Sequence, residues 1–180
     1  MLSVNLRLFR DFGFRNLILG AVVVIGGYSS AVQAQSVRLL GDFRDWSAYA
    51  TSDNAGQLCF AVSKPQSTEP TPDGLGLAYF YITHRPAENI RHELNMVAGY
   101  TFGQDSEAEI QIGSERIKLF TEADAAWLDN PAISSNVAGF MRAGSSMLVE
   151  GTTDKGIKIK HSFSLSGVTA ASRAIDAECS

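Results

Sequence analysis

The sequence predicts a mainly β domain, an antiparallel β-sandwich with one or two short helices. Apolar and polar residues alternate with a period of two over much of the chain, turn-forming residues separate the alternating segments, and helical spacing occurs in only two places. Alternation with a period of two puts every second side chain on the same face of a strand. Each segment can therefore bury one face in a common core.

Eight segments have the composition expected of strands: 46–51, 58–63, 77–84, 91–97, 109–112, 116–120, 147–150 and 157–165. The last is the clearest, because its apolar residues and His161 share one face while lysines and serines share the other. Residues 52–56 are turn formers and predict a hairpin between the first two segments. Residues 64–76 contain three prolines and two glycines, which favours a surface loop.

The two segments with helical spacing are short. The first has Ile133, Val137, Phe140 and Met141 on one stripe, with Asn130 and Pro131 at its start and Gly144 at its end. The second, near the C-terminus, has Val168, Ala171, Ile175 and Cys179 on one stripe. A helix there would direct Cys179 toward the body of the fold.

The first 34 residues have the pattern of a cleavable signal peptide. Three arginines precede an apolar run over 17–25, and small residues precede a cleavage site between Ala34 and Gln35. The run is about half as long as a membrane span requires, so we expect cleavage rather than an uncleaved anchor. The exported part, residues 35–180, would then be one domain without a stable membrane span. Its expected location is the periplasm, the outer membrane surface or the medium.

Removing the leader changes the charge balance of the chain. It leaves 12 basic and 18 acidic residues, a net charge of about −6 with neutral histidines. Because binding to a phosphate backbone depends on clustered Lys and Arg, nucleic acid is excluded as the expected partner. The remaining 146 residues suffice for one domain with its own core.

Both cysteines, Cys59 and Cys179, lie in the exported part. An even number of cysteines in an oxidising compartment favours a disulfide, and this one would close a loop of about 120 residues. The alternatives are a catalytic thiol or a thiolate metal site. Neither cysteine lies in a C-x-x-C motif, which favours the disulfide.

The histidines are the first candidates for chemistry. If two strands pair symmetrically around Glu88, His84 and His92 lie opposite one another, and His161 is also in phase with an apolar face. Three imidazoles could converge on a metal, two could form a pair that titrates near neutral pH, or all three could be unrelated. No metal-ligand spacing is present, so we predict no metal and no cofactor and keep the histidines as minor candidates.

Catalytic motifs are otherwise weak. The serines lack a G-x-S-x-G elbow, and no glycine-rich segment precedes a helix as a phosphate loop would. These observations predict a protein that is not an enzyme. The candidate binding residues are Trp46, Trp127, Asp124 and Arg85, since sugar sites often combine an aromatic ring with an acid. A tryptophan in a small β protein also commonly belongs to the core.

Several short blocks resemble the invasion-associated locus B family in order and spacing. They are Phe43-Arg44-Asp45-Trp46, Cys59 with Ser63-Lys64-Pro65, 79–83 with Arg85-Pro86, 88–91 with Glu93, Ile112-Gly113, 118–120, Ala126-Trp127, 141–144, 149–153 with Lys155-Gly156, 163–167 and Cys179. The resemblance covers the chain from about Phe43 to its end. It implies an exported protein of alphaproteobacterial type with an immunoglobulin-like sandwich and no established catalytic residues. Family members tend to carry small polar residues where this chain has its three histidines.

Three functions are compatible with these observations. The leading hypothesis is a non-enzymatic envelope protein that binds an unidentified envelope or cell-surface protein. The second is a periplasmic module that binds a sugar or another small molecule through Trp46 or Trp127. The third is a metal- or pH-responsive protein that uses His84 and His92. The sequence leaves the oligomeric state open.

Overall fold

A computed structural model describes residues 36–180 apart from Asp129. The predicted leader and the cleavage site at Ala34 and Gln35 lie outside the described residues. The strands are β1 (Arg38–Phe43), β2 (Trp46–Asp53), β3 (Gly56–Ser63), β4 (Ser67–Glu69), β5 (Tyr79–Arg85), β6 (Ile90–Val97), β7 (Glu107–Ile112), β8 (Glu115–Glu122), β9 (Ala125–Leu128), β10 (Ser146–Thr152) and β11 (Lys158–Ser164). The helices are α1 (Ser134–Ala143) and α2 (Val168–Glu178), with short 3₁₀ turns at Pro86–Glu88 and Pro131–Ile133.

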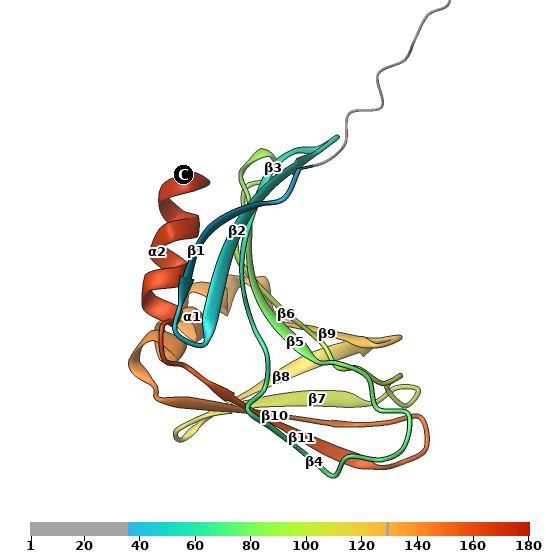
Figure 1. The fold of residues 1–180 in the computed structure, drawn as a ribbon. Helices are drawn as coiled ribbons and strands as arrows, with labels where there is room; N and C mark the ends of the chain where they lie inside the picture. The colour runs from blue at the N-terminus through green and yellow to red at the C-terminus, as the bar shows by residue number, and fades with distance from the viewer. Residues whose placement is uncertain (1–35, 129) are drawn as a thin grey trace, which may run out of the picture. The chain divides into compact units, whose positions relative to one another are not determined.

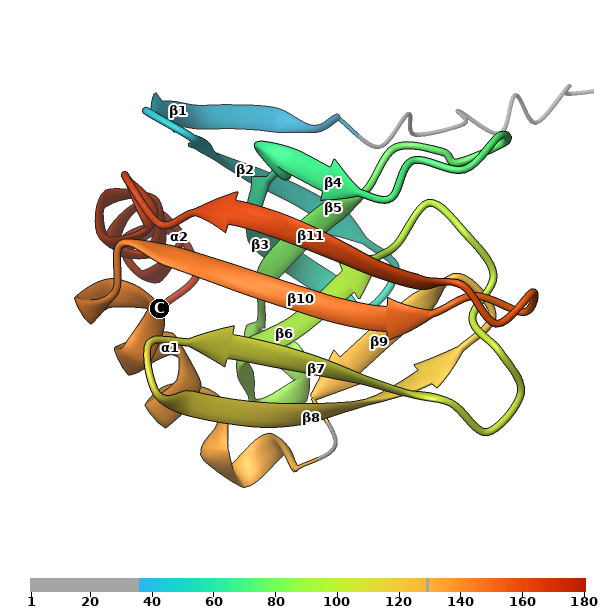
Figure 2. The same ribbon diagram turned by 90° about the horizontal axis from the view of Figure 1, so that it is seen from below.

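The described strands form one antiparallel sheet of eleven strands in the order β1-β2-β3-β5-β6-β9-β8-β7-β10-β11-β4. Figure 1 shows that this sheet is strongly bent, and Figure 2 shows β8, β7, β10, β11 and β4 running side by side as one layer. Helix α2 packs against β1, β2 and β3, and α1 packs against β6. The structure confirms the mainly β, antiparallel, sandwich-like fold with two short helices.

The core lies between the two ends of the bent sheet. Phe80 of β5 meets Phe163 of β11 edge to face, with ring centroids 5.8 Å apart, and both side chains are buried. Trp46 of β2 is 1% exposed, and its indole Nε1 donates a hydrogen bond of 2.9 Å to the Ser164 carbonyl at the end of β11. These contacts join strands far apart in the sheet order. The bent sheet therefore closes over one apolar interior.

Most predicted elements occur where alternation or helical spacing indicated them. The hairpin of β2 and β3 and the interior position of β5 between β3 and β6 are confirmed. Both predicted helices are present. Strands β1 and β9 were not predicted, and the segment 64–76, expected to be only a loop, contains the three-residue strand β4. This strand forms one edge of the sheet, where neighbouring prolines are tolerated.

Glycine is required where α2 begins. Gly167 has φ +98°, and a Cβ built at this position would lie 1.7 Å from the carbonyl oxygen of Phe43. The close approach lets the start of α2 rest on the turn between β1 and β2, where the Asp45 amide also donates to the Ser166 carbonyl. The start of α2 is thus held against this turn by the glycine that precedes the helix.

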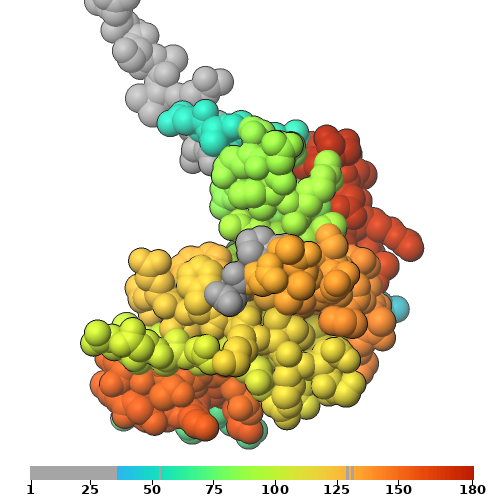
Figure 3. Space-filling model, turned by 180° about the vertical axis from the view of Figure 1, so that it is seen from behind, coloured from blue at the N-terminus to red at the C-terminus, as the bar shows by residue number. Residues whose placement is uncertain are grey.

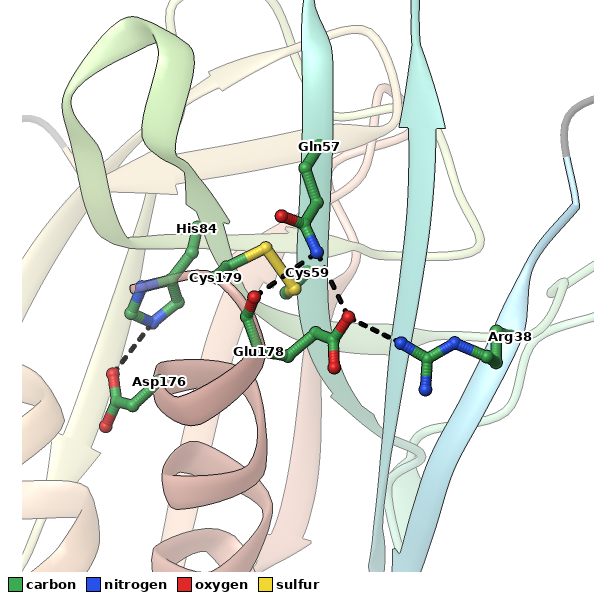
Figure 4. Close-up of a disulfide and its surroundings, with 7 residues drawn as sticks. All are labelled: Arg38, Gln57, Cys59, His84, Asp176, Glu178 and Cys179. Atoms are coloured by element: carbon green, nitrogen blue, oxygen red, sulfur yellow. Dashed lines mark hydrogen bonds and ion pairs between the residues drawn. A yellow bond between two sulfur atoms is a disulfide. The ribbon is translucent and has the colours of Figure 1, made fainter.

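The other end of α2 is fixed covalently. Cys179, directly after the helix, forms the predicted disulfide with Cys59 in the middle of β3, with a Cα–Cα distance of 6.0 Å and a sequence separation of 120. Neighbouring polar contacts add to it, because Gln57 donates to the backbone carbonyl and side chain of Glu178, which also pairs with Arg38 (Figure 4). The last turn of α2 is held against the β1–β3 end of the sheet.

This attachment gives the first prediction. Replacing both Cys59 and Cys179 by serine should lower the free energy of unfolding by up to about 4 to 5 kcal/mol. Without the cross-link, which closes a long loop, the unfolded chain has more conformational entropy and is therefore favoured. Urea unfolding under non-reducing conditions measures the difference. Adding reductant should destabilise the wild-type protein and leave the double variant unchanged, which serves as the control. Two alkylated cysteines in the unreduced wild-type protein would show that the bond does not form.

Candidate functional site

Two of the three histidines meet at the turn between β5 and β6. The strands pair as the symmetric register around Glu88 predicts, as far as Thr83 opposite Glu93. The register then shifts, with Arg85 opposite Ile90. The rings of His84 and His92 are nevertheless in contact, with centroids 4.7 Å apart and planes at 67°. The structure thus brings together the two histidines that symmetric pairing would place opposite one another, although a register shift interrupts that pairing here.

The register shift is a bulge in β6. Arg91 and His92 together stand opposite the single residue His84, and His92 has φ +55°. Histidine is among the residues that adopt this left-handed conformation more often than most side chains do. A bulge redirects the side chains beside it, and bulges recur next to functional sites. Here it is one of the features that place the His92 ring beside His84.

A carboxylate from the C-terminal helix completes the group. Asp176 Oδ1 lies 3.5 Å from His84 Nε2 and 3.8 Å from His92 Nε2. Figure 4 shows His84 and Asp176 facing each other beside the disulfide. The His84 side chain is fully buried, whereas the Asp176 side chain is 44% exposed. The three side chains therefore form a cluster that opens to solvent at its acidic end.

The buried imidazoles of this cluster lack hydrogen-bond partners. Neither ring nitrogen of His84 has one, and neither does Nδ1 of His92. Leaving a buried polar atom unpaired costs free energy, so native proteins do so rarely. Of these unpaired nitrogens, Nε2 of His84 is the one that faces the Asp176 carboxylate.

Burial determines the charge of these rings. The pKa of His84 is lowered to about 4, chiefly by loss of solvent and also by the proximity of His92 and Arg91, while Asp176 acts in the opposite direction. Burial also lowers the pKa of His92, with Arg142 and Arg91 acting in the same sense and Asp176 opposing them. Both rings are thus neutral at neutral pH, and their contacts with Asp176 are not ion pairs there. A neutral imidazole has a nitrogen lone pair available for coordination.

His161 lies elsewhere, so the hypothesis that all three histidines converge is wrong. Its Nδ1 lies 2.9 Å from Thr68 Oγ1, and its ring stacks on Tyr100 with centroids 6.0 Å apart. The remaining nitrogen, Nε2, is buried without a partner. A threonine–histidine pair that acts as nucleophile and base needs a third group to orient the base. Since no such group contacts Nε2, this pair resembles buried packing more than a catalytic site.

The two tryptophans differ in accessibility. Trp46 is a buried core residue, so the prediction that it binds a ligand is wrong. Trp127 in β9 is partly exposed and stacks on Phe120 of β8, with ring centroids 5.5 Å apart and planes at 18°. Phe120 is 45% exposed. In Figure 3 the yellow atoms of the β8–β9 region adjoin the orange atoms of α1 on the back face.

The stacked pair borders a small hollow of about 230 Å³, which we call the aromatic groove. Its other lining residues are Ile90, Arg91, Glu93, Leu94, Leu128 and Ser134. An exposed aromatic face beside one cation and one anion can hold either an apolar side chain or a sugar ring. Of the sequence-predicted binding residues, Trp127 therefore has the most suitable surroundings.

The other two candidates do not join Trp127. Arg85 pairs with Glu93 across the β5–β6 hairpin, with Nε 3.3 Å from Oε2. Asp124, in the turn before β9, lines a different and wider hollow of about 580 Å³ together with Tyr100 and Lys155. The predicted combination of Asp124 with Trp127 as one sugar site is therefore not formed.

Asp176 was not predicted from the sequence. A signal was nonetheless present, because the helical stripe places it three residues before Cys179, whose disulfide partner Cys59 pairs with His84 in adjacent strands. An acid three residues before Cys179 can therefore reach His84, as Asp176 does. The missing step was to combine the disulfide with the strand register.

Comparisons with known proteins identify a similar fold. The structure is similar to the crystal structure of invasion associated protein B from Bartonella henselae, with a TM-score of 0.52 and 12% sequence identity. The match covers 77% of this chain and 96% of that one. No family model matches the sequence, and no curated protein matches it. At 12% sequence identity, this structural similarity shows that the two proteins share a fold.

One further structural fact concerns the membrane. Within the part of the chain that the structure describes, neither helix combines the length and hydrophobicity that a membrane span requires.

His161 leads to a prediction about pH. Burial lowers its pKa from 6.5 to about 4, so between these values the unfolded chain binds a proton that the folded chain does not. Stability should therefore fall as the pH drops from about 6.5 to about 4. In His161→Gln this decline should be smaller by up to about 3 kcal/mol, measured by urea unfolding at each pH.

The variant retains part of the decline, because His84 titrates in the same direction. At pH 7 and above, His161 contributes no pH dependence, so the two proteins should show parallel stability profiles there. The prediction would be contradicted if the difference in free energy of unfolding between the two proteins stayed the same from pH 7 down to pH 4.

Proposed function

We propose that this chain is an exported cell-envelope protein of the invasion-associated locus B family that acts by binding a partner protein rather than by catalysis. The observation that carries the proposal is the fold shared with invasion associated protein B. The family-like sequence blocks and the predicted signal peptide agree with it. The disulfide is of the kind found in proteins of oxidising compartments.

The chemistry of the described residues is consistent with binding. Both cysteines are engaged in the disulfide, and the Thr68–His161 pair has no third group to orient it. The aromatic groove has an apolar surface, and the charged residues Arg91 and Glu93 also line it. Exposed aromatic side chains beside charged groups are common anchors in protein interfaces. We infer that the envelope partner contacts this groove.

A capture experiment tests this function. Tagged protein produced in its native cells should appear in the periplasmic or secreted fraction. Its mass should be that of a chain whose first residue is Gln35. After cross-linking it should co-purify with a specific envelope protein. Phe120→Ser should reduce that capture about tenfold, because interface aromatic anchors typically contribute more than 1 kcal/mol.

Leu77→Ser is the matched control. Leu77 is 70% exposed and is not part of the aromatic groove, so this change alters surface hydrophobicity elsewhere and should leave capture intact. Absence of any captured protein above background would refute the binding function. Equal capture by Phe120→Ser and wild type would place the contact on another surface.

A sugar or another small molecule is the second candidate ligand, favoured by the stacked Trp127–Phe120 pair. A glycan that stacks on Trp127 should quench tryptophan fluorescence, and Trp127→Phe should abolish that response. Trp46 is a silent internal reference because it is buried in the core. A glycan and metabolite library that produces no quenching would eliminate this candidate.

A further inference from the structure

We propose that His84, His92 and Asp176 form a binding site for a divalent transition-metal ion of the zinc type. The ligand atoms would be Nε2 of each histidine and Oδ1 of the aspartate. The proposal goes beyond the partner-binding function and does not depend on it. It rests on the geometry of the three side chains, on the unpaired Nε2 of His84 and on the rigidity of the elements that hold them.

The distances suit a tetrahedral ion. Zinc–ligand bonds of about 2.0 to 2.2 Å place neighbouring ligand atoms about 3.3 Å apart. The two histidine–aspartate distances are 3.5 and 3.8 Å, and the three ligand atoms all lie within 4.8 Å of one another. The three ligand atoms would have to approach one another by about 1 Å or less around most of the site to bind such an ion.

The unpaired Nε2 of His84 supplies an independent reason for a ligand. His84 is completely buried and has no hydrogen-bond partner at either nitrogen. Its Nε2 faces Asp176 at a separation longer than a normal hydrogen bond. An ion between these atoms would satisfy Nε2 of His84 and the carboxylate at once. Without an ion the buried nitrogen has nothing to offset its loss of solvent.

Three rigid elements position the ligands. His84 lies in β5, His92 lies in the bulge of β6, and Asp176 lies in the last turn of α2. The disulfide fixes that turn, since Cys179 follows Asp176 by three residues and Cys59 pairs with His84 in adjacent strands. A site held by regular structure is already organised before the ion arrives. Solvent reaches the cluster at Asp176, which leaves a fourth coordination position for water.

The donor set determines which ion fits. Two imidazole nitrogens and one carboxylate oxygen suit zinc, cobalt, nickel or copper, whereas calcium and magnesium prefer oxygen ligands. Arg91 and Arg142 lie close enough to disfavour extra positive charge at His92. Attraction by charge alone is therefore weak here, and binding must come from coordination. We expect selectivity for zinc over calcium.

Histidine NMR with zinc chloride is the decisive experiment. The protein is used with its disulfide intact and without a polyhistidine tag. It contains three histidines, so each imidazole signal can be assigned by single substitution. Zinc should shift the signals of His84 and His92 with one-to-one stoichiometry. His161 should not respond, because it lies outside the cluster, and calcium chloride should shift none of the three.

Calorimetry of variants tests the ligands one at a time. Asp176→Asn keeps the size of a partly exposed side chain, and it should weaken zinc binding by about 100-fold or more, beyond the roughly 10- to 100-fold loss typical for an outer-shell partner. His92→Gln should do the same. Asp154→Asn, at an exposed carboxylate outside the cluster, should bind zinc like the wild type. Circular dichroism confirms that each variant is folded.

Three results would overturn the proposal. The first is an absence of zinc-induced shifts at His84 and His92. The second is a response of His161 as large as theirs, which would indicate nonspecific binding to imidazoles. The third is unchanged zinc affinity in folded Asp176→Asn. In each case the cluster would be only packing between α2 and the β5–β6 hairpin.

Discussion

The attachment of α2 to β3 is the constraint on which the rest of the structure depends. Gly167 fixes the start of the helix against the turn between β1 and β2, and the Cys59–Cys179 disulfide fixes its end. Between these points the helix covers one end of the bent sheet. A helix of eleven residues has little stability of its own, so tertiary contacts must hold it. Releasing the covalent end would free the turn that carries Asp176.

The same attachment explains how the domain tolerates an unfavourable group of side chains. His84 loses its solvent and gains no hydrogen bond, which opposes folding. It lies directly beside Cys59 in the paired strands β3 and β5. The cross-link disfavours the unfolded chain and can offset such a cost. The strongest local constraint and the least satisfied polar residue are thus neighbours in the sheet.

The sequence predicted those parts of the fold that depend on local patterns. Alternation identified β11, the symmetric turn around Glu88 suggested that His84 and His92 lie close together, and two cysteines in a segment expected to be exported identified the disulfide. It did not indicate β1, where register shifts near Gly41, or β9, which has no polar residue to alternate. The bulge was also missed, since positive φ at a histidine follows from tertiary packing.

Asp176 shows why a site is harder to predict than a fold. By itself it is an acid on a partly exposed helix face, which describes most acids in soluble proteins. It becomes distinctive only because a disulfide, a strand pairing and a bulge bring one buried and one partly buried imidazole within 4 Å of its carboxylate. The strand pairing and the bulge belong to one hairpin, whereas the disulfide joins residues 120 positions apart and brings the helix that carries Asp176 to that hairpin. The acid therefore belongs to no local motif, and finding it requires combining the disulfide with the strand register.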